Sequence, residues 1–199
     1  DNKSPLKPKL SKCGKKVLVP GLTKQEVLST ENVRKTLRNI AYKNRSTGIT
    51  NMNEHSSRSH ALIFIDILKE KTNQISRLVL IDLAGSERVK KSGVTGIAFD
   101  EARNINKSLS ALGNVINSLQ TKQKHIPFRD SQLTYLLYDC LGHKTSKALM
   151  FCNISCELND VKESVNTLQF ANRVRRVELG EATKNSDDND DNINNHNNH

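Results

Sequence analysis

The order of apolar and polar residues along the chain predicts both helices and strands. Apolar residues recur at helical spacing over 29–43 and 101–119, so each stretch should form a helix with one apolar face. Two short apolar runs, 61–68 and 77–83, are separated by a polar stretch, which predicts two neighbouring strands joined by a hairpin-like turn. Helices that alternate with strands are typical of an α/β domain.

The second half of the chain continues this alternation. A helix is expected from about residue 131 to 141, a buried strand over the apolar run 148–154, and a last helix from about 160 to 177. Polar residues that can accept backbone hydrogen bonds stand where each helix should begin. The candidate caps are Ser29 or Thr30, Asp130 or Ser131, and Asn159 or Asp160.

The two ends of the chain depart from this pattern. Residues 1–16 are rich in lysine and contain two prolines, so an extended or edge-strand segment is expected there rather than a helix. From residue 185 onward the chain is mostly Asn, Asp and His, a composition that cannot bury enough apolar surface to fold. We therefore divide the chain into a folded domain, 1–180, and a disordered tail, 181–199.

Charge is distributed unevenly between these two parts. The 199 residues carry a formal net charge of +10. The tail holds five acidic residues and one lysine, which leaves 30 basic and 16 acidic residues in the domain. Such a domain is attracted to acidic surfaces, whether nucleic acid, anionic lipid or an acidic protein polymer, and charge alone does not choose among them.

Cysteine usage and hydropathy favour a soluble, cytoplasmic protein. The chain opens with no signal segment, and its longest apolar runs are too short to cross a bilayer. Apart from the pair at 152 and 156, the cysteines lack metal-ligand spacing, so reduced thiols are expected. The four are Cys13, Cys140, Cys152 and Cys156.

Two segments carry candidate chemistry, and the first is LVLIDLAGSE at 78–87. It is an apolar strand that ends at Asp82 and is followed by Gly85. Ligands of α/β sheets bind at this end of the strands, where an aspartate commonly holds Mg²⁺ through water and a glycine amide meets a phosphate oxygen. The alternative is an ordinary turn led by an aspartate.

The second segment is NEHSSRSH at 53–60. It combines hydroxyl, amide, guanidinium and imidazole groups directly before a predicted strand. Hydroxyl groups can ligate Mg²⁺ and position water, and an arginine can pair with a carboxylate or phosphate through two hydrogen bonds. The alternative is a solvated polar loop.

Together with their neighbours, these segments resemble the kinesin motor domain. NEHSSRSH resembles the switch I motif of that family, DLAGSE its switch II motif, and NINKSLSALGNVI the helix that follows switch II. VLVPGLT resembles the segment ahead of the switch I helix, HIPFRDSQLT the microtubule-facing loop and helix start, and LMFCNIS and LQFANRV the last strand and helix. The resemblance runs from about residue 10 to about residue 180 and identifies the chain as the C-terminal part of a kinesin motor domain.

This resemblance implies a kinesin-type P-loop NTPase fold, an α/β fold whose central, mostly parallel sheet has helices on both faces. It also implies ATP and Mg²⁺ as cofactors and a microtubule-stimulated ATPase activity. The 199 residues contain no G-x-x-x-x-G-K-[ST], the loop that cradles the phosphates. We therefore expect that the N-terminal P-loop half is missing and that the chain by itself is inactive.

The resemblance implies roles for four residues at the γ-phosphate and its metal ion. Ser57 would ligate Mg²⁺, and Asp82 would anchor the same ion through its water shell. Ser56 would hold the attacking water, and Gly85 would offer its amide to the γ-phosphate. These roles fit phosphoryl transfer, which depends on positioning and on charge stabilisation.

Three further residues would close the site. The resemblance implies that Arg58 and Glu87 form a salt bridge that joins the two switches over the nucleotide and relays a proton from the attacking water. Asn53 would support the geometry of switch I.

The resemblance also implies that the acidic partner is the microtubule, with no nucleic acid and no membrane involved. The family meets tubulin with the loop after switch II, the long helix and the HIPFRDSQLT region. For any single lysine, a solvated surface charge is the alternative. The candidates are Lys90, Lys91, Lys107, Lys122, Lys124, His125 and Arg129.

The segment NRVRRVELG, which leads into the acidic tail, resembles the end of a C-terminal-motor, minus-end-directed kinesin. Such kinesins dimerise through a coiled-coil stalk, here outside this chain, and we expect the cytoplasm and the microtubule cytoskeleton, including the spindle, as the location. A truncated microtubule-binding or regulatory module without ATPase activity stays open as an alternative. An unrelated GTPase is disfavoured because no guanine-specifying N-K-x-D occurs.

Overall fold

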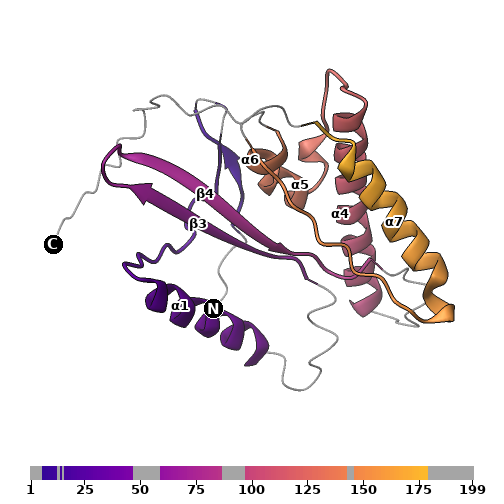
Figure 1. Cartoon of the computed structure of the whole chain (residues 1–199), viewed down its shortest axis with the longest axis horizontal. Coiled ribbons are helices and arrows are strands. Elements are labelled where there is room, and N and C mark those ends of the chain that lie inside the picture. Colours follow the sequence, from indigo (N-terminus) through magenta and orange to yellow (C-terminus); the bar gives the residue numbers. More distant parts are fainter. Residues whose placement is uncertain are drawn as a thin grey trace.

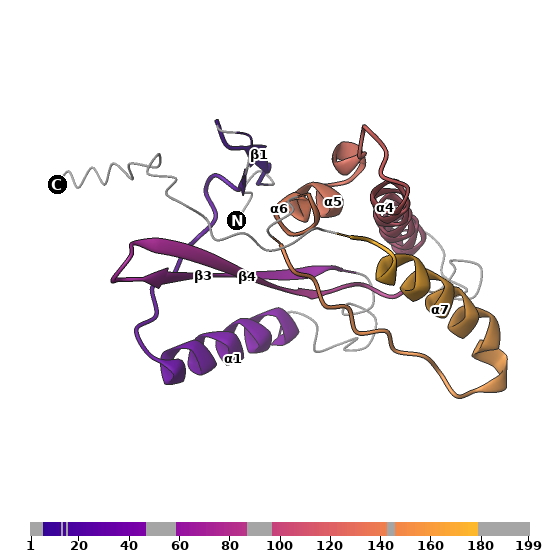
Figure 2. The same ribbon diagram turned by 45° about the horizontal axis from the view of Figure 1, so that its top comes forward.

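The computed structural model of the chain describes residues 6–12, 14, 16–46, 59–86, 97–142 and 146–178. The elements are β1 (Lys9–Leu10), β2 (Val17–Leu18), α1 (Thr30–Ser46), β3 (Ala61–Lys69), β4 (Gln74–Asp82), α4 (Ile97–Gln120), the 3-10 helix η1 (Phe128–Asp130), α5 (Gln132–Leu136), α6 (Tyr138–Leu141), the 3-10 helix η2 (Leu158–Asp160) and α7 (Val161–Arg175). A long hairpin of β3 and β4 occupies the centre (Figure 1). Helix α1 lies on one side of this hairpin, β1 and β2 lie on the other, and α4 to α7 gather at one end (Figure 2).

Strands β3 and β4 form the hairpin predicted from the two apolar runs. Their antiparallel pairing begins with Ala61 opposite Asp82 and ends with Lys69 opposite Gln74. Asn73 closes the turn with a φ of 51°, in the left-handed region that asparagine tolerates better than most residues. The ladder extends past the apolar runs toward the turn because backbone hydrogen bonds do not require apolar side chains.

The first predicted helix is confirmed as α1, which ends three residues later than expected. Ser29 caps it: the Ser29 hydroxyl oxygen accepts the N–H of Asn32 at 3.2 Å, and its carbonyl accepts the N–H of Val33 at 3.0 Å. Glu31 in the first turn places a negative charge at the positive end of the helix dipole.

The hydrophobic core lies where α4 packs against α5 and α7. Leu112 and Ile116 of α4 are 6% and 3% exposed and cluster with Leu133 and Leu137. Burial of each such side chain contributes about 1.5–3 kcal/mol, so the apolar face predicted for 101–119 anchors the helices to one another. Partly buried side chains from the hairpin base and the last helix also pack against this cluster, among them Leu62, Leu83, Phe170 and Val174.

The helix predicted from 131 to 141 is in fact two short helices, α5 and α6. Ser131 caps the first: its hydroxyl accepts the N–H of Thr134 at 3.1 Å, and the Thr134 hydroxyl accepts the N–H of Ser131 at 3.2 Å. The helical path stops at Leu137, where ψ is −1° and the side chain is buried. The turn sets Tyr138 edge-on to Phe128, with ring centroids 5.1 Å apart. Tertiary packing therefore overrides the helical periodicity here.

The buried strand predicted over 148–154 is wrong. Leu149 and Phe151 are 82% and 80% exposed, and this segment belongs to neither of the two antiparallel sheets of the described residues, β1–β2 and β3–β4. An apolar run forms a buried strand only where neighbouring strands pair with its edges, and no described strand does so. Because the described strands pair only as these two antiparallel sheets, they do not form the mostly parallel central sheet that the resemblance implies.

The remaining helices start close to their predicted positions. Helix α4 begins at Ile97, four residues earlier than expected. Asp160 is the residue that precedes α7, but its side chain makes no capping hydrogen bond. Instead, the 3-10 turn η2 leads the chain into the helix, with the N–H of Asp160 donated to the carbonyl of Glu157 at 3.0 Å.

The N-terminal region is extended as predicted, with the two-residue strands β1 and β2 paired in antiparallel fashion. The cysteines at 140, 152 and 156 are free thiols, as expected, whereas the one at 13 lies outside the described residues. The tail predicted to be disordered, 181–199, also lies outside them. None of the described helices has the length and apolar character needed to cross a membrane.

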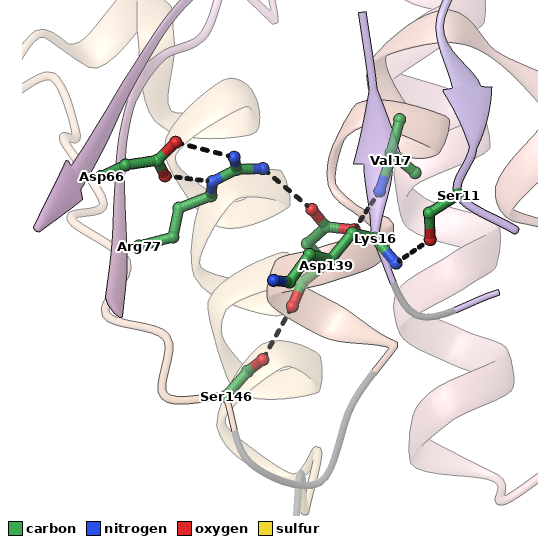
Figure 3. Close-up of polar contacts among 7 residues, drawn as sticks. All are labelled: Ser11, Lys16, Val17, Asp66, Arg77, Asp139 and Ser146. Atoms are coloured by element: carbon green, nitrogen blue, oxygen red, sulfur yellow. Dashed lines mark hydrogen bonds and ion pairs between the residues drawn. The ribbon is translucent and has the colours of Figure 1, made fainter. Parts of the chain in front are cut away.

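A polar network joins the hairpin to the N-terminal strands and to α6 (Figure 3). Arg77 of β4 donates two hydrogen bonds to Asp66 of β3, from Nε at 2.6 Å and from Nη2 at 3.0 Å. Its Nη1 donates to Asp139 of α6 at 3.2 Å. The Asp139 carboxylate also accepts the N–H of Val17 at 2.7 Å, and its backbone carbonyl accepts the Ser146 hydroxyl at 2.8 Å.

Candidate functional site

The base of the hairpin brings together the described ends of the two segments that carry candidate chemistry. His60 is the last residue of NEHSSRSH and directly precedes Ala61, which pairs with Asp82. The register therefore places the end of one segment against the start of the other. The remaining residues predicted for this site lie outside the described residues: Asn53, Ser56, Ser57, Arg58 and Glu87.

Asp82 and Gly85 belong to a short segment whose middle is anchored in the core. Leu83 packs against the buried cluster, and Ala84 is 4% exposed. Asp82 itself is exposed, and Gly85 is half-buried. The buried side chains fix the backbone while the Asp82 carboxylate stays open to solvent, an arrangement that suits a carboxylate holding a hydrated cation.

His60 ties this segment to helix α4. Its Nδ1 accepts the backbone N–H of Ala84 at 3.0 Å, and its Nε2 lies 2.6 Å from the Oγ of Ser108. Burial lowers the pKa of His60, which favours the neutral ring. The sequence alone assigns His60 no role. Its place between a polar segment and an apolar strand is the only local sign that a polar contact forms at the edge of the core.

The basic residues predicted to meet an acidic partner are all exposed where the structure describes them. Lys122, Lys124 and His125 lie in the turn after α4, and Arg129 follows in η1. Lys107 is on α4 itself, about 20 Å from Gln120 at the end of that helix, at a rise of 1.5 Å per residue. The structure thus groups four of the candidates at one end of α4 and separates the fifth. Lys90 and Lys91 lie outside the described residues.

One of these cations already has an acidic neighbour within the chain. Lys122 Nζ lies 2.9 Å from a carboxylate oxygen of Glu178, which follows α7. The hydrogen bond from Lys122 lowers the pKa of Glu178. Both side chains are about three-quarters exposed, so the pair contributes little to stability, but it brings the end of the described chain to the basic turn.

Comparison with known proteins shows the family to which the chain belongs. A family model described as the kinesin motor domain matches residues 2–177. The chain belongs to the kinesin motor domain family. The sequence resemblance and the fold class that it implies are therefore confirmed at the level of the family.

Named relatives give the same result. The kinesin-like protein KIN-14E of Oryza sativa subsp. japonica is 49% identical over 173 residues, which cover 85% of this chain and 16% of that protein. Among solved structures, the motor domain of the Saccharomyces cerevisiae kinesin-related protein Kar3 is 41% identical with a TM-score of 0.68 and covers 86% of this chain and 54% of that one. The C-terminal motor domain of Kar3 from Candida glabrata is 38% identical with a TM-score of 0.62 and covers 85% and 51%.

These relatives support the predicted resemblance to C-terminal-motor, kinesin-14-type kinesins. The kinesin chain described here spans about a sixth of the length of that curated relative and about half of the solved motor domains. The activity and partners of a whole kinesin are therefore a matter of proposal for this chain.

Kinesin motor domains as a family bind ATP with Mg²⁺ and associate with microtubules. Within the described residues, no three His, Cys, Asp or Glu side chains come together as a metal cage. A Mg²⁺ ion that accompanies a nucleotide needs only one or two protein oxygens because it keeps several waters. The exposed carboxylate of Asp82 fits such an ion, and the hydroxyl expected to complete the site, Ser57, lies outside the described residues.

Proposed function

We propose that the chain is the switch and microtubule-binding part of a motor that couples ATP hydrolysis to movement along microtubules. The phosphates of ATP would be held by a G-x-x-x-x-G-K-[ST] loop, which does not occur in these 199 residues. The chain would supply the groups that respond to the γ-phosphate and the surface that meets tubulin.

The observation that carries this proposal is the register of β3 and β4, in which Ala61 lies opposite Asp82. His60, the last residue of NEHSSRSH, therefore directly precedes the residue that pairs with Asp82 at the end of β4. Two loops that close over one γ-phosphate need a common rigid base, and a ladder of nine residues on each strand is such a base. Loop closure can then change the distance between the two segments without moving β3 and β4.

In the proposed site, Asp82 holds Mg²⁺ through its water shell and Ser57 ligates the ion directly. Gly85 offers its amide to the γ-phosphate, and Ser56 orients the attacking water. The bound Mg²⁺ would neutralise charge on the phosphate oxygens, as in other phosphoryl-transfer enzymes. The accessible Asp82 carboxylate at the end of β4 supports this assignment.

Closure of the site is assigned to Arg58 and Glu87, with Asn53 as support for the first segment. A salt bridge between a guanidinium and a carboxylate can form two parallel hydrogen bonds, so it selects one relative position of the two loops. Arg58 lies two residues before His60, and Glu87 lies two residues after Gly85. Both residues are therefore close in sequence to His60 and Gly85, which the structure describes at the hairpin base.

The proposed track is the acidic surface of the microtubule. The exposed cations at the end of α4 fit a broad electrostatic contact, which speeds association and weakens with salt. We further propose movement toward the minus end, dimerisation through a coiled-coil stalk outside this chain, and a cytoskeletal location that includes the spindle. Among these assignments, the kinesin-14 names of the relatives support the direction of movement.

A microtubule-binding or regulatory module without ATPase activity is the second candidate. It applies if the natural full-length protein has no phosphate-cradling loop, and none occurs in these 199 residues. This candidate predicts that the natural full-length protein sediments with microtubules and releases no phosphate above background. The two candidates therefore differ in one assay, phosphate release with microtubules present.

The Mg²⁺ role of Asp82 gives the sharper test in the natural full-length protein. Asp82→Asn should raise the Mg²⁺ concentration for half-maximal ATPase activity by about tenfold or more, because it removes the anionic partner of the ion's water shell. Glu26→Gln, the matched neutralisation of an exposed carboxylate outside this site, should change it by less than about twofold. An unchanged Mg²⁺ requirement in Asp82→Asn would remove the assigned role, and an unmodified protein without microtubule-stimulated turnover would contradict the proposed motor function.

A further inference from the structure

The imidazole of His60 is hydrogen-bonded on both nitrogens to parts of the chain that the proposed motor function needs to coordinate. On one side is the backbone of Ala84, the residue directly before Gly85. On the other side is the hydroxyl of Ser108 on α4, directly after Lys107. A single side chain thus connects residues that are 24 and 48 positions away in the sequence.

The direction of these hydrogen bonds follows from the chemistry of the partners. A backbone N–H can only donate, so Nδ1 of His60 must accept from Ala84, and the neutral ring carries its proton on Nε2. This proton is donated to Ser108 Oγ at 2.6 Å, and the Ser108 hydroxyl donates in turn to the carbonyl of Ile105 at 2.7 Å. Every donor in the series has an acceptor, so the linkage has one arrangement for the neutral ring.

The linkage also fixes the orientation of a peptide group that matters to the site. Ala84 is 4% exposed, and Leu83 before it packs against the core cluster. With its N–H held by His60, the peptide group between Leu83 and Ala84 has a defined plane. The next peptide group carries the amide of Gly85, which is the group assigned to the γ-phosphate.

From this geometry we propose that His60 is a positioning residue that holds the segment Leu83–Gly85 against α4, so that the γ-phosphate-sensing backbone and the microtubule-facing helix move together. The inference rests on the proposed motor function and adds to it a specific physical link between the two sites. Without the link, each element would keep its own packing, but binding of α4 to a microtubule would no longer be transmitted to the Gly85 amide through a direct hydrogen-bonded path.

The linkage is tested most cleanly from the α4 side, because Ser108→Ala keeps His60 and the helix. Ser108→Ala should reduce the microtubule-stimulated turnover of the full-length protein by about tenfold, whereas Ser108→Thr, which retains the hydroxyl, should stay within about twofold of the unmodified protein. His60→Ala should show at least the loss of Ser108→Ala. A lower melting temperature with an unchanged ratio of microtubule-stimulated to basal turnover would mean that the contact is only structural, and would overturn the proposal.

Amide hydrogen exchange supplies a readout that does not depend on activity. Exchange at Ala84 should become about tenfold faster in both His60→Ala and Ser108→Ala. Ser110→Ala, which removes a hydroxyl two residues further along α4 and outside the linkage, should leave Ala84 exchange unchanged. Unchanged Ala84 exchange in Ser108→Ala would contradict the linkage itself. If the unmodified protein lacks microtubule-stimulated turnover, the motor function fails, and the coupling role proposed for His60 fails with it, while the exchange result still decides whether the contact holds Ala84.

Discussion

Arg77 of β4 and Asp139 of α6, 62 residues apart in the chain, form an ion pair with an Nη1–Oδ2 distance of 3.2 Å (Figure 3). The two side chains are only 27% and 13% exposed. Asp139 also accepts the backbone N–H of Val17 at 2.7 Å, so one carboxylate joins the central hairpin to the N-terminal strand pair.

Removal of this carboxylate should destabilise the fold. Asp139→Ala leaves the Val17 N–H without its acceptor and takes away one of the two carboxylates bound by Arg77. The free energy of unfolding, measured with urea on the full-length protein, should fall by about 1–3 kcal/mol. Glu157→Ala removes an exposed carboxylate and should change it by less than about 0.5 kcal/mol. Equal stability of the two variants would show that the network is incidental.

The pairing of Asp66 with Arg77 should make stability depend on pH. The hydrogen bond from Arg77 lowers the pKa of Asp66 below its ordinary value of 3.8. The folded-state pKa of Asp66 lies below its unfolded-state pKa. The stabilisation is therefore fully present above the unfolded-state pKa and is lost as the pH falls through the folded-state pKa. Asp66→Asn should therefore be less stable than the parent at pH 6, with a deficit that shrinks below pH 4.

Urea titrations from pH 6 to pH 3 measure this dependence. The effect should be small because the Asp66 side chain is 39% exposed and solvent screens its charge. A deficit of constant size across the whole range would mean that the substitution acts through packing rather than through the ionised carboxylate.

The basic turn after α4 should set the strength of microtubule binding. Lys124→Ala should weaken co-sedimentation of the full-length protein by about two- to fivefold at low salt, and Lys107→Ala and Arg129→Ala should act in the same direction. Lys69→Ala is the matched control, since Lys69 ends β3 at the hairpin tip, away from α4 (Figure 1). The differences should diminish with added salt because exposed charges are screened over about 8 Å at physiological ionic strength. Binding that is insensitive to salt, or equally weakened by Lys69→Ala, would mean that the turn is a solvated surface.

The chain of 199 residues on its own should associate into aggregates. Large apolar side chains are exposed on the segment after α6 and at the start of the last helical region, with Leu149 at 82%, Phe151 at 80% and Leu158 at 89%. Large apolar side chains left open to solvent favour association in water. Light scattering should detect particles larger than a monomer, with binding of a dye for apolar surface. A monodisperse monomer that unfolds cooperatively would contradict this expectation.

The sequence predicts those elements whose signals are local. The hairpin of β3 and β4 follows from two apolar runs and a polar turn, and α4 follows from a long 3.6-residue period that matches its buried face. The separation of α5 from α6 was not predictable, because Leu137 ends the helix to meet a core assembled from distant segments. The strand predicted over 148–154 does not form, because an apolar pattern does not specify which strands, if any, will pair with it.

The candidate site likewise has features that the local sequence predicts and contacts that it does not predict. The residue types of NEHSSRSH and DLAGSE indicate phosphate chemistry, and the register of the hairpin places the described ends of both segments together. The hydrogen bond from the Ala84 N–H to His60 and the ion pair between Lys122 and Glu178 join segments far apart in sequence. Such contacts depend on the folded path of the chain, so no local pattern predicts them.

The central claim is that the segments held at the hairpin base close over a γ-phosphate through Arg58 and Glu87. The most direct measurement is microtubule-stimulated phosphate release by the full-length protein, compared with Arg58→Ala, Glu87→Ala and the charge exchange Arg58→Glu with Glu87→Arg. Each alanine variant should lose at least about tenfold in turnover while nucleotide affinity stays within about threefold, because the salt bridge acts on closure and not on the phosphate cradle. The charge exchange should recover part of the loss. Alanine variants with turnover within about threefold of the parent, a barrier difference of only about 0.7 kcal/mol, would contradict the claim.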